Sequence, residues 1–329
     1  MRRFAVRFLL IVIAVAALIG AGFGYWGWRM FTEPGPLGAE KVVIVAKGSG
    51  IRSVARQLES AGIVSNRTLF VLGARYLGLG MRFRAGEFAF VSGMSMREVA
   101  NHLVSGEMVV RRLTVPEGLL SADVVKIVDA ADGLSGDVSA APPDGRLLPE
   151  TYFYSYGDDR RAVIGRMEAA MQKALDEVWR DRSPDIAIRT PEEALVLASI
   201  IERETGIDAE RARISAVFHN RLRRGMRLQS DPTVAYAVTS GRQLLDRPLT
   251  SADLKVDSPY NTYENGGLPP GPIANPGRAA LEAAVKPLST NEYYFVADGT
   301  GGHAFAPTLN EHNRNVARWR HLQRQKNAK

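Results

Sequence analysis

The stretch PEEALVLASIIERET, residues 191–205, decides the fold of the main part of this chain. Thr190, Pro191 and Glu193 predict a helix start, because threonine can cap, proline fits the first turn and the glutamate can close a capping box. Residues 194–201 are apolar on nearly every side of the predicted helix, so we expect it to lie in a protein core. Gly206 is expected to end it.

Two glutamates, Glu202 and Glu204, stand in the last turn of this predicted helix. The helix macrodipole disfavours negative charge there, and burial disfavours it further, so the pKa of a carboxyl group is raised. A general acid that works near neutral pH needs such a raised pKa. Ordinary salt bridges to Arg203, Arg211 or Arg213 are the alternative interpretation, and composition alone favours that alternative.

Periodicity separates the two glutamates. Positions two apart differ by about 200° around a helix, so the two side chains cannot share one pocket. Glu204 follows Ile201 at i+3 and Leu197 at i+7, which continues the inner stripe, whereas Glu202 lies further round. The spacing therefore favours Glu204 as the functional carboxyl group.

The N-terminus predicts a membrane span. Residues 8–28 contain no charged side chain, and about 20 such residues cross a hydrocarbon core as a helix. Three arginines precede this span and three aromatic residues lie near its end, which predicts a cytoplasmic tail over residues 1–7 and an exported remainder. A signal peptide cleaved near residues 20–22 is the alternative, but the apolar run is longer than a typical h-region.

The net charge of +7 does not indicate a nucleic-acid groove. Three arginines lie before the apolar run, and six Lys/Arg with no acid lie in the tail from Arg314 to Lys329. Without these nine, 33 basic residues remain against 35 acidic ones, so the body is nearly neutral. Nucleic acid is therefore not an expected partner.

The chain has no cysteine and five histidines, and the histidines lack the spacing of HExxH-type ligands. Disulfides and thiolate metal sites are excluded. We expect neither a metal nor another cofactor.

The rest of the chain predicts two α+β units behind a stiff, Pro- and Gly-containing spacer over residues 29–40. In the first unit, Ser95 and Glu98 form a capping-box signature. A Pro-, Gly- and Ser-rich stretch at 129–145 predicts a loop or lid. The predicted units are a small domain over 41–108, with strands from Lys41 and Glu87 and helices over 49–61, 66–76 and 95–105, and a larger domain over 109–329, with a helix over 161–178.

Three later segments mix aromatic, amide and hydroxyl side chains with Gly and Pro. Aromatic rings offer faces to sugar rings, and amides offer hydrogen bonds to hydroxyl groups, so we interpret these segments as surface loops along a sugar-binding groove. Turns without function are the alternative. The segments are RLQSDPTVAYA from Arg227, SPYNTYENGGLPPGPIANPG from Ser258 and YYFVADGTGGHAFAPTLNEHN from Tyr293.

Taken in order, IIERET, RLQSDPTVAYA, SPYNTY with GLPPGPIANPG, and YYFVADGTGGHAF with EHN resemble the endolytic murein transglycosylases of the MltG (YceG-like) family. The resemblance runs from the apolar N-terminus to about Asn315. It implies a LysM-like small domain, a catalytic domain, and cleavage of glycan strands between N-acetylmuramic acid and N-acetylglucosamine. One departure is LPETY at Leu148, where the family often has a Phe-Pro-Asp run, so Glu150 receives no role.

The resemblance also implies that the second glutamate of ERET, Glu204, is catalytic. In such enzymes one carboxyl group serves as acid and then as base, and the products carry 1,6-anhydro-muramic acid ends. We expect nine residues along the sugar groove, with a structural role as the alternative for each. They are Ser230, Asp231, Thr233, Tyr260, Asn261, Thr262, Tyr263, His303 and Asn313.

Two other functions remain open from the residues. A hydrolase usually needs a second carboxylate, for which Asp231 or Asp257 is available. A non-catalytic, membrane-tethered wall-binding protein is the other. The anchor and short spacer favour action on nascent glycan at the outer face of the inner membrane, and the resemblance suggests glycan-polymerising penicillin-binding proteins as partners.

Overall fold

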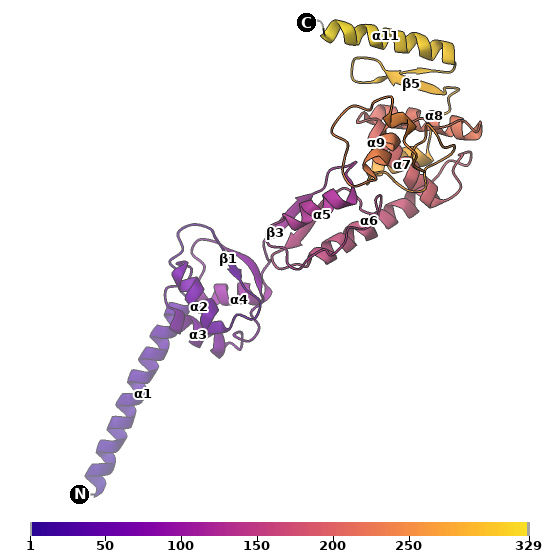
Figure 1. The fold of residues 1–329 in the computed structure, drawn as a ribbon. Coiled ribbons are helices and arrows are strands. Elements are labelled where there is room, and N and C mark those ends of the chain that lie inside the picture. The colour runs from indigo at the N-terminus through magenta and orange to yellow at the C-terminus, as the bar shows by residue number, and fades with distance from the viewer. Residues whose placement is uncertain (1, 328–329) are drawn as a thin grey trace. The chain divides into compact units, whose positions relative to one another are not determined.

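A computed structural model describes residues 2–327 of the chain (Figure 1). The chain separates into two compact units, residues 1–111 with 153–158, and residues 112–152 with 159–329. Helices and two-stranded sheets both occur, so the α+β prediction is confirmed. The domain boundaries proposed from the sequence stay predictions.

The first unit contains helices and one antiparallel sheet. Its elements are α1 (Arg2–Thr32), β1 (Lys41–Val45), α2 (Ile51–Ser60), α3 (Arg67–Tyr76), β2 (Gly86–Phe90) and α4 (Met96–Ser105). The division between the units falls within β3 (Val110–Thr114) and β4 (Thr151–Ser155), which form a sheet of their own.

The second unit is mostly helical and ends in a hairpin and a helix. Its elements are α5 (Ser121–Asp129), α6 (Arg160–Arg180), α7 (Pro191–Glu204), α8 (Asp208–Arg223), α9 (Asp231–Thr239), η1 (Asp253–Lys255), α10 (Arg278–Val285), β5 (Tyr294–Ala297), β6 (His303–Ala306) and α11 (Leu309–Asn327).

The core of the small unit lies between its sheet and its helices. β1 and β2 pair antiparallel, with Val43 opposite Phe88, and both side chains are buried. Apolar residues of α2, α3 and α4 pack in the same cluster. The expected capping box at the start of α4 is present, because Ser95 and Glu98 exchange side-chain and backbone hydrogen bonds.

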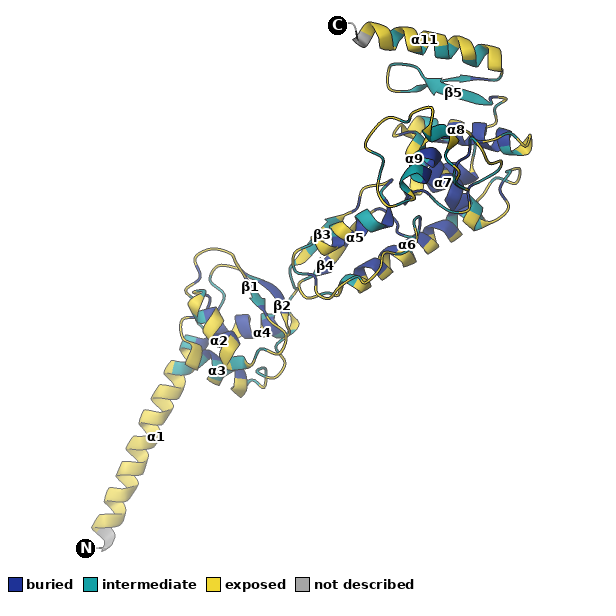
Figure 2. Cartoon of the chain, viewed as in Figure 1, coloured by how far each residue is buried: buried dark blue, intermediate teal, exposed yellow. Residues whose placement is uncertain are grey.

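Helix α1 is exposed along most of its length (Figure 2). It is long and apolar enough to cross a membrane. Its last turns pack on α3 and α4, and Phe31 is buried in the core of the small unit. Phe31 lies against Gly73 of α3, where a Cβ atom would overlap the phenylalanine ring. The apolar helix is thus docked onto the small unit rather than only linked to it.

Helix α7 forms the centre of the large unit. All residues from Ala194 to Ile201 are buried, as the dark blue of α7 in Figure 2 shows. It packs against α6, α8, α9 and α10. Thr190 caps its start, since the hydroxyl group accepts a hydrogen bond from the Glu193 amide. Because α7 is held on all sides, its C-terminal residue has a fixed position.

Two of the three segments expected to be loops are partly regular structure, so that expectation was wrong for them. The segment from Arg227 enters α9, where Pro232 stands in the first turn and Val234 is buried. The segment from Tyr293 forms the β5–β6 hairpin and enters α11. A few buried apolar side chains and backbone pairing stabilise these elements. A composition rich in Gly and Pro does not predict either kind of contact. The basic tail from Arg314 lies in α11.

The contact between Phe31 and Gly73 generates a prediction. Gly73→Ala should lower the stability of the full-length protein by about 1–3 kcal/mol, because the methyl group must displace the Phe31 ring. Gly165→Ala is the matched control: Gly165 lies in the exposed part of α6 with open space around it, so alanine should stabilise by about 0.5–1 kcal/mol. Thermal unfolding in a neutral detergent measures both, and a stabilising Gly73→Ala would contradict the docking.

Candidate active site

Glu204 is the last residue of α7 and lines a cavity of about 390 Å³. Thr205 follows in an extended conformation, and its hydroxyl group accepts a hydrogen bond from the Ile207 amide at 3.0 Å. This turn stops the helix at Glu204, two residues before Gly206. The cavity is lined by Glu204, Arg221, Leu228, Gln229, Asp231, Tyr263, Phe295, Val296, Ala297, His303, His312, Val316 and Trp319.

The surroundings of Glu204 shift the pKa of its carboxyl group. Burial, and to a lesser degree the charge of Asp231, raises the pKa of this carboxyl group to about 7. Two groups act in the opposite direction: Ser230 donates its hydroxyl hydrogen bond to Glu204 Oε1 at 2.5 Å, and Arg221 contributes a positive charge. Near neutral pH the carboxyl group therefore exists in both forms, so it can give a proton and take one back.

Glu202 lies in different surroundings, where its contacts connect parts of the fold. Its Oε2 accepts a hydrogen bond from the Gly277 amide at 3.0 Å, directly before α10. Its Oε1 lies 3.7 Å from the guanidinium of Arg211, and its side chain is 6% exposed. Glu202 does not line the cavity. This placement is consistent with the helical spacing, which predicts different surroundings for Glu202 and Glu204.

Ser230 is positioned by two buried threonines. The Ser230 amide donates to Thr262 Oγ1 at 3.0 Å, and Thr233 Oγ1 donates to the Ser230 carbonyl at 2.7 Å. The hydroxyl oxygens of Thr233 and Thr262 lie 2.8 Å apart. Gln229, in the left-handed region at φ 50°, donates its amide to the Thr262 carbonyl. The two segments are thereby fixed to each other beneath the Ser230 hydroxyl group.

Arg221 of α8 is a buried cation beside the cavity. Its Nε donates to the Tyr293 carbonyl at 2.6 Å, and its Nη1 donates to the Leu228 carbonyl at 2.7 Å. Its guanidinium also lies over the Tyr294 ring. Burial lowers the pKa of Arg221. These contacts join α8 to both cavity-lining segments and place a positive charge where an anionic Glu204 would be stabilised.

Two further polar pairs place side chains on the cavity wall, namely Tyr263 with Asp231 and His303 with Glu210 behind it. The Tyr263 hydroxyl group donates to Asp231 Oδ1 at 2.6 Å. Burial and this contact raise the pKa of Tyr263, so its phenol stays protonated. On the other wall, Glu210 of α8 accepts from the His303 backbone amide at 2.9 Å and lies 2.7 Å from His303 Nδ1. The hairpin that carries His303 is thus tied to α8.

The predicted groove residues fall into three groups. Asp231, Tyr263 and His303 line the cavity with Glu204, and Ser230 contacts Glu204 directly. The second group does not line this cavity: Thr233, Asn261 and Thr262 are buried, and the ring of Tyr260 packs at a tilt against that of Tyr236. Asn313 is exposed and does not line the cavity. Their proposed roles in binding stay predictions.

A second cavity, of about 500 Å³, shares Asp231 and Trp319 with the first. Tyr236 lines it, and its hydroxyl group donates to Asp144 at 2.9 Å. Asp144 also accepts from the Ser121 amide at 2.7 Å, so this end of the predicted 129–145 loop is fastened to the large unit. The two cavities therefore adjoin at Asp231 and Trp319.

Comparison with known proteins supplies the family. A model of the YceG-like family matches residues 43–318, which is most of the chain. The chain belongs to the YceG-like family. The predicted resemblance is thereby confirmed.

Relatives of this YceG-like chain carry the name endolytic murein transglycosylase. One from Bacillus subtilis is 30% identical over 335 residues, covering 90% of this chain and 89% of the relative. One from Streptococcus pneumoniae serotype 2 is 29% identical and covers 94% of this chain, which spans only 64% of that relative's length. A crystal structure of a yceG-like protein from Listeria monocytogenes aligns with a TM-score of 0.51 at 29% identity, covering 84% of this chain and 98% of that one.

Sequence reasoning missed five polar or aromatic lining residues of this YceG-like site: Arg221, Gln229, Phe295, His312 and Trp319. Arg221 and His312 had signals in the sequence. An arginine in the middle of a helix with buried neighbours is expected to need partners, and His312 adjoins the predicted Asn313. Gln229 and Phe295 lie inside segments interpreted as groove loops, but no local pattern singled them out, and the positive φ of Gln229 accompanies a contact with Thr262, distant in the sequence. Trp319 lies in the C-terminal tail from Arg314, for which only the positive charge was considered.

The raised pKa of Glu204 predicts a pH-dependent effect on stability. Below the usual glutamate pKa of 4.5 the group is protonated in both folded and unfolded states. Between pH 4.5 and about 7 the unfolded chain ionises while the folded protein keeps its proton, so the parent loses stability as the pH rises. Glu204→Gln does not titrate. We expect its stability relative to the parent to increase by about 1–3 kcal/mol between pH 4 and pH 8.

Chemical denaturation at the two pH values measures this change. Glu192→Gln is the matched control, because Glu192 is exposed in the first turn of the same helix. Its difference from the parent should stay nearly constant between the two pH values. An equally constant difference for Glu204→Gln would show that the folded protein does not hold the proton.

Proposed function

We propose that this chain is a membrane-anchored endolytic lytic transglycosylase that cleaves peptidoglycan between N-acetylmuramic acid and N-acetylglucosamine. The observation that carries the proposal is Glu204 itself, a carboxyl group with a pKa near 7 at the wall of a cavity that adjoins a second one. The family and the printed names of the relatives support the same class of reaction.

The proposed reaction uses one carboxyl group twice. Protonated Glu204 gives its proton to the glycosidic oxygen, and the bond from this oxygen to C1 of the muramoyl residue breaks through an oxocarbenium-like state. The 6-hydroxyl oxygen of the same sugar then bonds to C1 and closes a 1,6-anhydro ring. Its proton returns to the Glu204 carboxylate, which restores the starting state, and no water is consumed.

The surrounding groups support both forms of Glu204. Burial favours the acid that begins the reaction, whereas the Ser230 hydrogen bond and the charge of Arg221 stabilise the carboxylate that follows it. The buried threonine pair fixes the backbone of Ser230, whose hydroxyl group already contacts Glu204. Asp231, Tyr263 and His303 are proposed to contact the sugar from the cavity wall.

A hydrolase is the competing function, and Asp231 is the observation that favours it. This second carboxylate lines the same cavity as Glu204, although the Tyr263 hydroxyl group already occupies one of its oxygens. The other sequence candidate, Asp257, is exposed and does not line the cavity. The two functions differ in their products, because a hydrolase leaves reducing ends and a transglycosylase leaves 1,6-anhydro ends.

Helix α1 indicates where in the cell the protein acts. We propose that α1 crosses the cytoplasmic membrane with residues 1–7 inside the cell and the remainder outside, as the positively charged N-terminal side indicates. The enzyme then acts on nascent glycan strands near the membrane and terminates their elongation. Glycan-polymerising penicillin-binding proteins are the proposed partners, since they extend the strands that such an enzyme cuts.

Digestion of purified glycan strands with end-group mass spectrometry tests the proposal. The parent and the Glu192→Gln control should release fragments with 1,6-anhydro-muramic acid ends. Glu204→Gln should lose activity by about 10²–10⁴-fold, because the amide cannot donate or accept the proton. Reducing ends from the parent would establish the hydrolase instead. Binding of strands with no cleavage by any of the proteins would establish a wall-binding module.

A further inference from the structure

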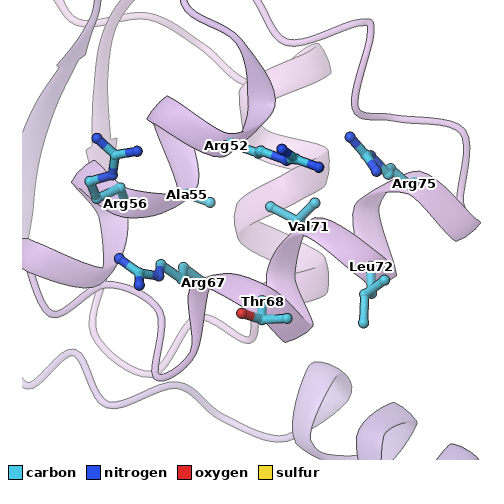
Figure 3. Close-up of a pocket in the computed structure, with 8 residues that line it drawn as sticks. All are labelled: Arg52, Ala55, Arg56, Arg67, Thr68, Val71, Leu72 and Arg75. Atoms are coloured by element: carbon cyan, nitrogen blue, oxygen red, sulfur yellow. The ribbon is translucent and has the colours of Figure 1, made fainter.

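Four arginines surround a groove between α2 and α3 of the small unit, away from Glu204 in the sequence and in a different unit (Figure 3). Arg52 and Arg56 come from α2, and Arg67 and Arg75 come from α3. The cavity has a volume of about 340 Å³. Its other lining residues are Ala55, Thr68, Val71 and Leu72. We call this the arginine groove.

The positive charge of the arginine groove is mostly uncompensated. Arg67 lies 3.6 Å from Glu59, but within residues 2–327 no carboxylate lies within ion-pair distance of Arg52, Arg56 or Arg75. All four side chains are exposed. Like charges placed side by side repel each other, so a cluster of this kind is favourable when an anion binds between the guanidinium groups.

An apolar cavity of about 570 Å³ adjoins the arginine groove. It lies between α1 and α3 and is lined by Phe23, Gly24, Gly27, Trp28, Phe31, Leu69, Leu72, Gly73 and Tyr76. Leu72 lines both cavities, so the apolar cavity and the arginine groove meet at this side chain. Gly24 of α1 has open space beside it, whereas Gly73 of α3 is covered by the Phe31 ring.

The apolar cavity lies at the end of the helix that is long enough to cross a membrane. Trp28, the last residue of the uncharged run, contacts Tyr76 of α3 edge to face with ring centroids 6.1 Å apart. The guanidinium of Arg97 from α4 lies 5.9 Å from the Trp28 ring centroid. Trp, Tyr and Arg at one level of such a helix are typical of the membrane–water interface. Leu72 and Tyr76 are exposed there.

We propose that these two adjoining cavities bind one anionic phospholipid, with its phosphate among the arginines and part of an acyl chain between α1 and α3. The inference rests on α1 lying in a bilayer, as given under the proposed function, and on nothing in the catalytic site. A soluble anion would use the arginine groove alone and would leave the adjoining apolar cavity empty. A phospholipid matches both surfaces, because the apolar cavity is lined by the proposed membrane helix α1 and the adjoining arginine groove is not.

Such binding would hold the small unit against the membrane surface. Each arginine near an anionic lipid surface contributes about fivefold in affinity. We expect loss of two arginines to weaken binding of an anionic lipid by about 10–30-fold while binding of a zwitterionic lipid changes little.

Native mass spectrometry of the full-length protein in a neutral detergent tests the proposal, with phosphatidylglycerol or phosphatidylcholine titrated in. The variant Arg52→Gln/Arg75→Gln removes two groove charges from different helices. The matched control Arg82→Gln/Arg84→Gln removes two exposed arginines of the same unit that do not line the groove. The parent and the control should prefer phosphatidylglycerol, and the groove variant should lose that preference. Millimolar inorganic phosphate should not displace the bound lipid.

Three results would overturn the proposal. Equal binding of phosphatidylglycerol by all three proteins would show that the groove does not recognise the headgroup. Equal weakening in both double variants would reduce the effect to net charge. Complete displacement by inorganic phosphate would show a site for a soluble anion. Glycan cleavage does not enter the readout, so failure here and failure of the proposed enzymatic function are distinguishable.

Discussion

The site depends on the confinement of one carboxyl group at the end of a buried helix. Glu204 ends α7, whose preceding residues from Ala194 to Ile201 are enclosed by neighbouring helices. Burial makes ionisation of the Glu204 carboxyl group unfavourable, and the hydrogen bond from the Ser230 hydroxyl group offsets part of this effect. The balance between these two effects places the pKa of Glu204 near 7. A more exposed carboxyl group would be ionised at neutral pH, and one without Ser230 would be a weaker acid.

The same helix end shows how two identical side chains acquire different roles. Glu202 lies two positions earlier and faces the start of α10 and the buried Arg211, where it joins structural elements. Glu204 faces the cavity. The apolar core around α7 fixes the rotation of the helix about its axis. Because residues two positions apart point in different directions from a helix, Glu202 and Glu204 then face different surroundings. The cavity then depends on segments far away in the sequence, above all those fastened by Thr233 and Thr262.

Much of this arrangement was predictable from local patterns. The apolar run at 194–201, its Thr-Pro start and the Ser95 capping box are short-range signals that tertiary packing reinforces, and the structure contains all of them. The position of Glu204 on the inner face followed from helical spacing. Helix α9 and the β5–β6 hairpin did not follow, because Pro232 and the glycines near residue 300 suggest loops while the stabilising contacts are distant. The same limit concealed Arg221, which acquires its importance from carbonyl groups at Leu228 and Tyr293.

The most direct measurement of the central claim is the titration of the Glu204 carboxyl carbon by ¹³C NMR, assigned by comparison with Glu204→Gln. The account predicts a pKa of about 7. In Ser230→Ala the pKa should be higher still, because the lost hydroxyl group donates to the ionised form. A titration near the ordinary glutamate value of 4.5, unchanged in Ser230→Ala, would contradict the account.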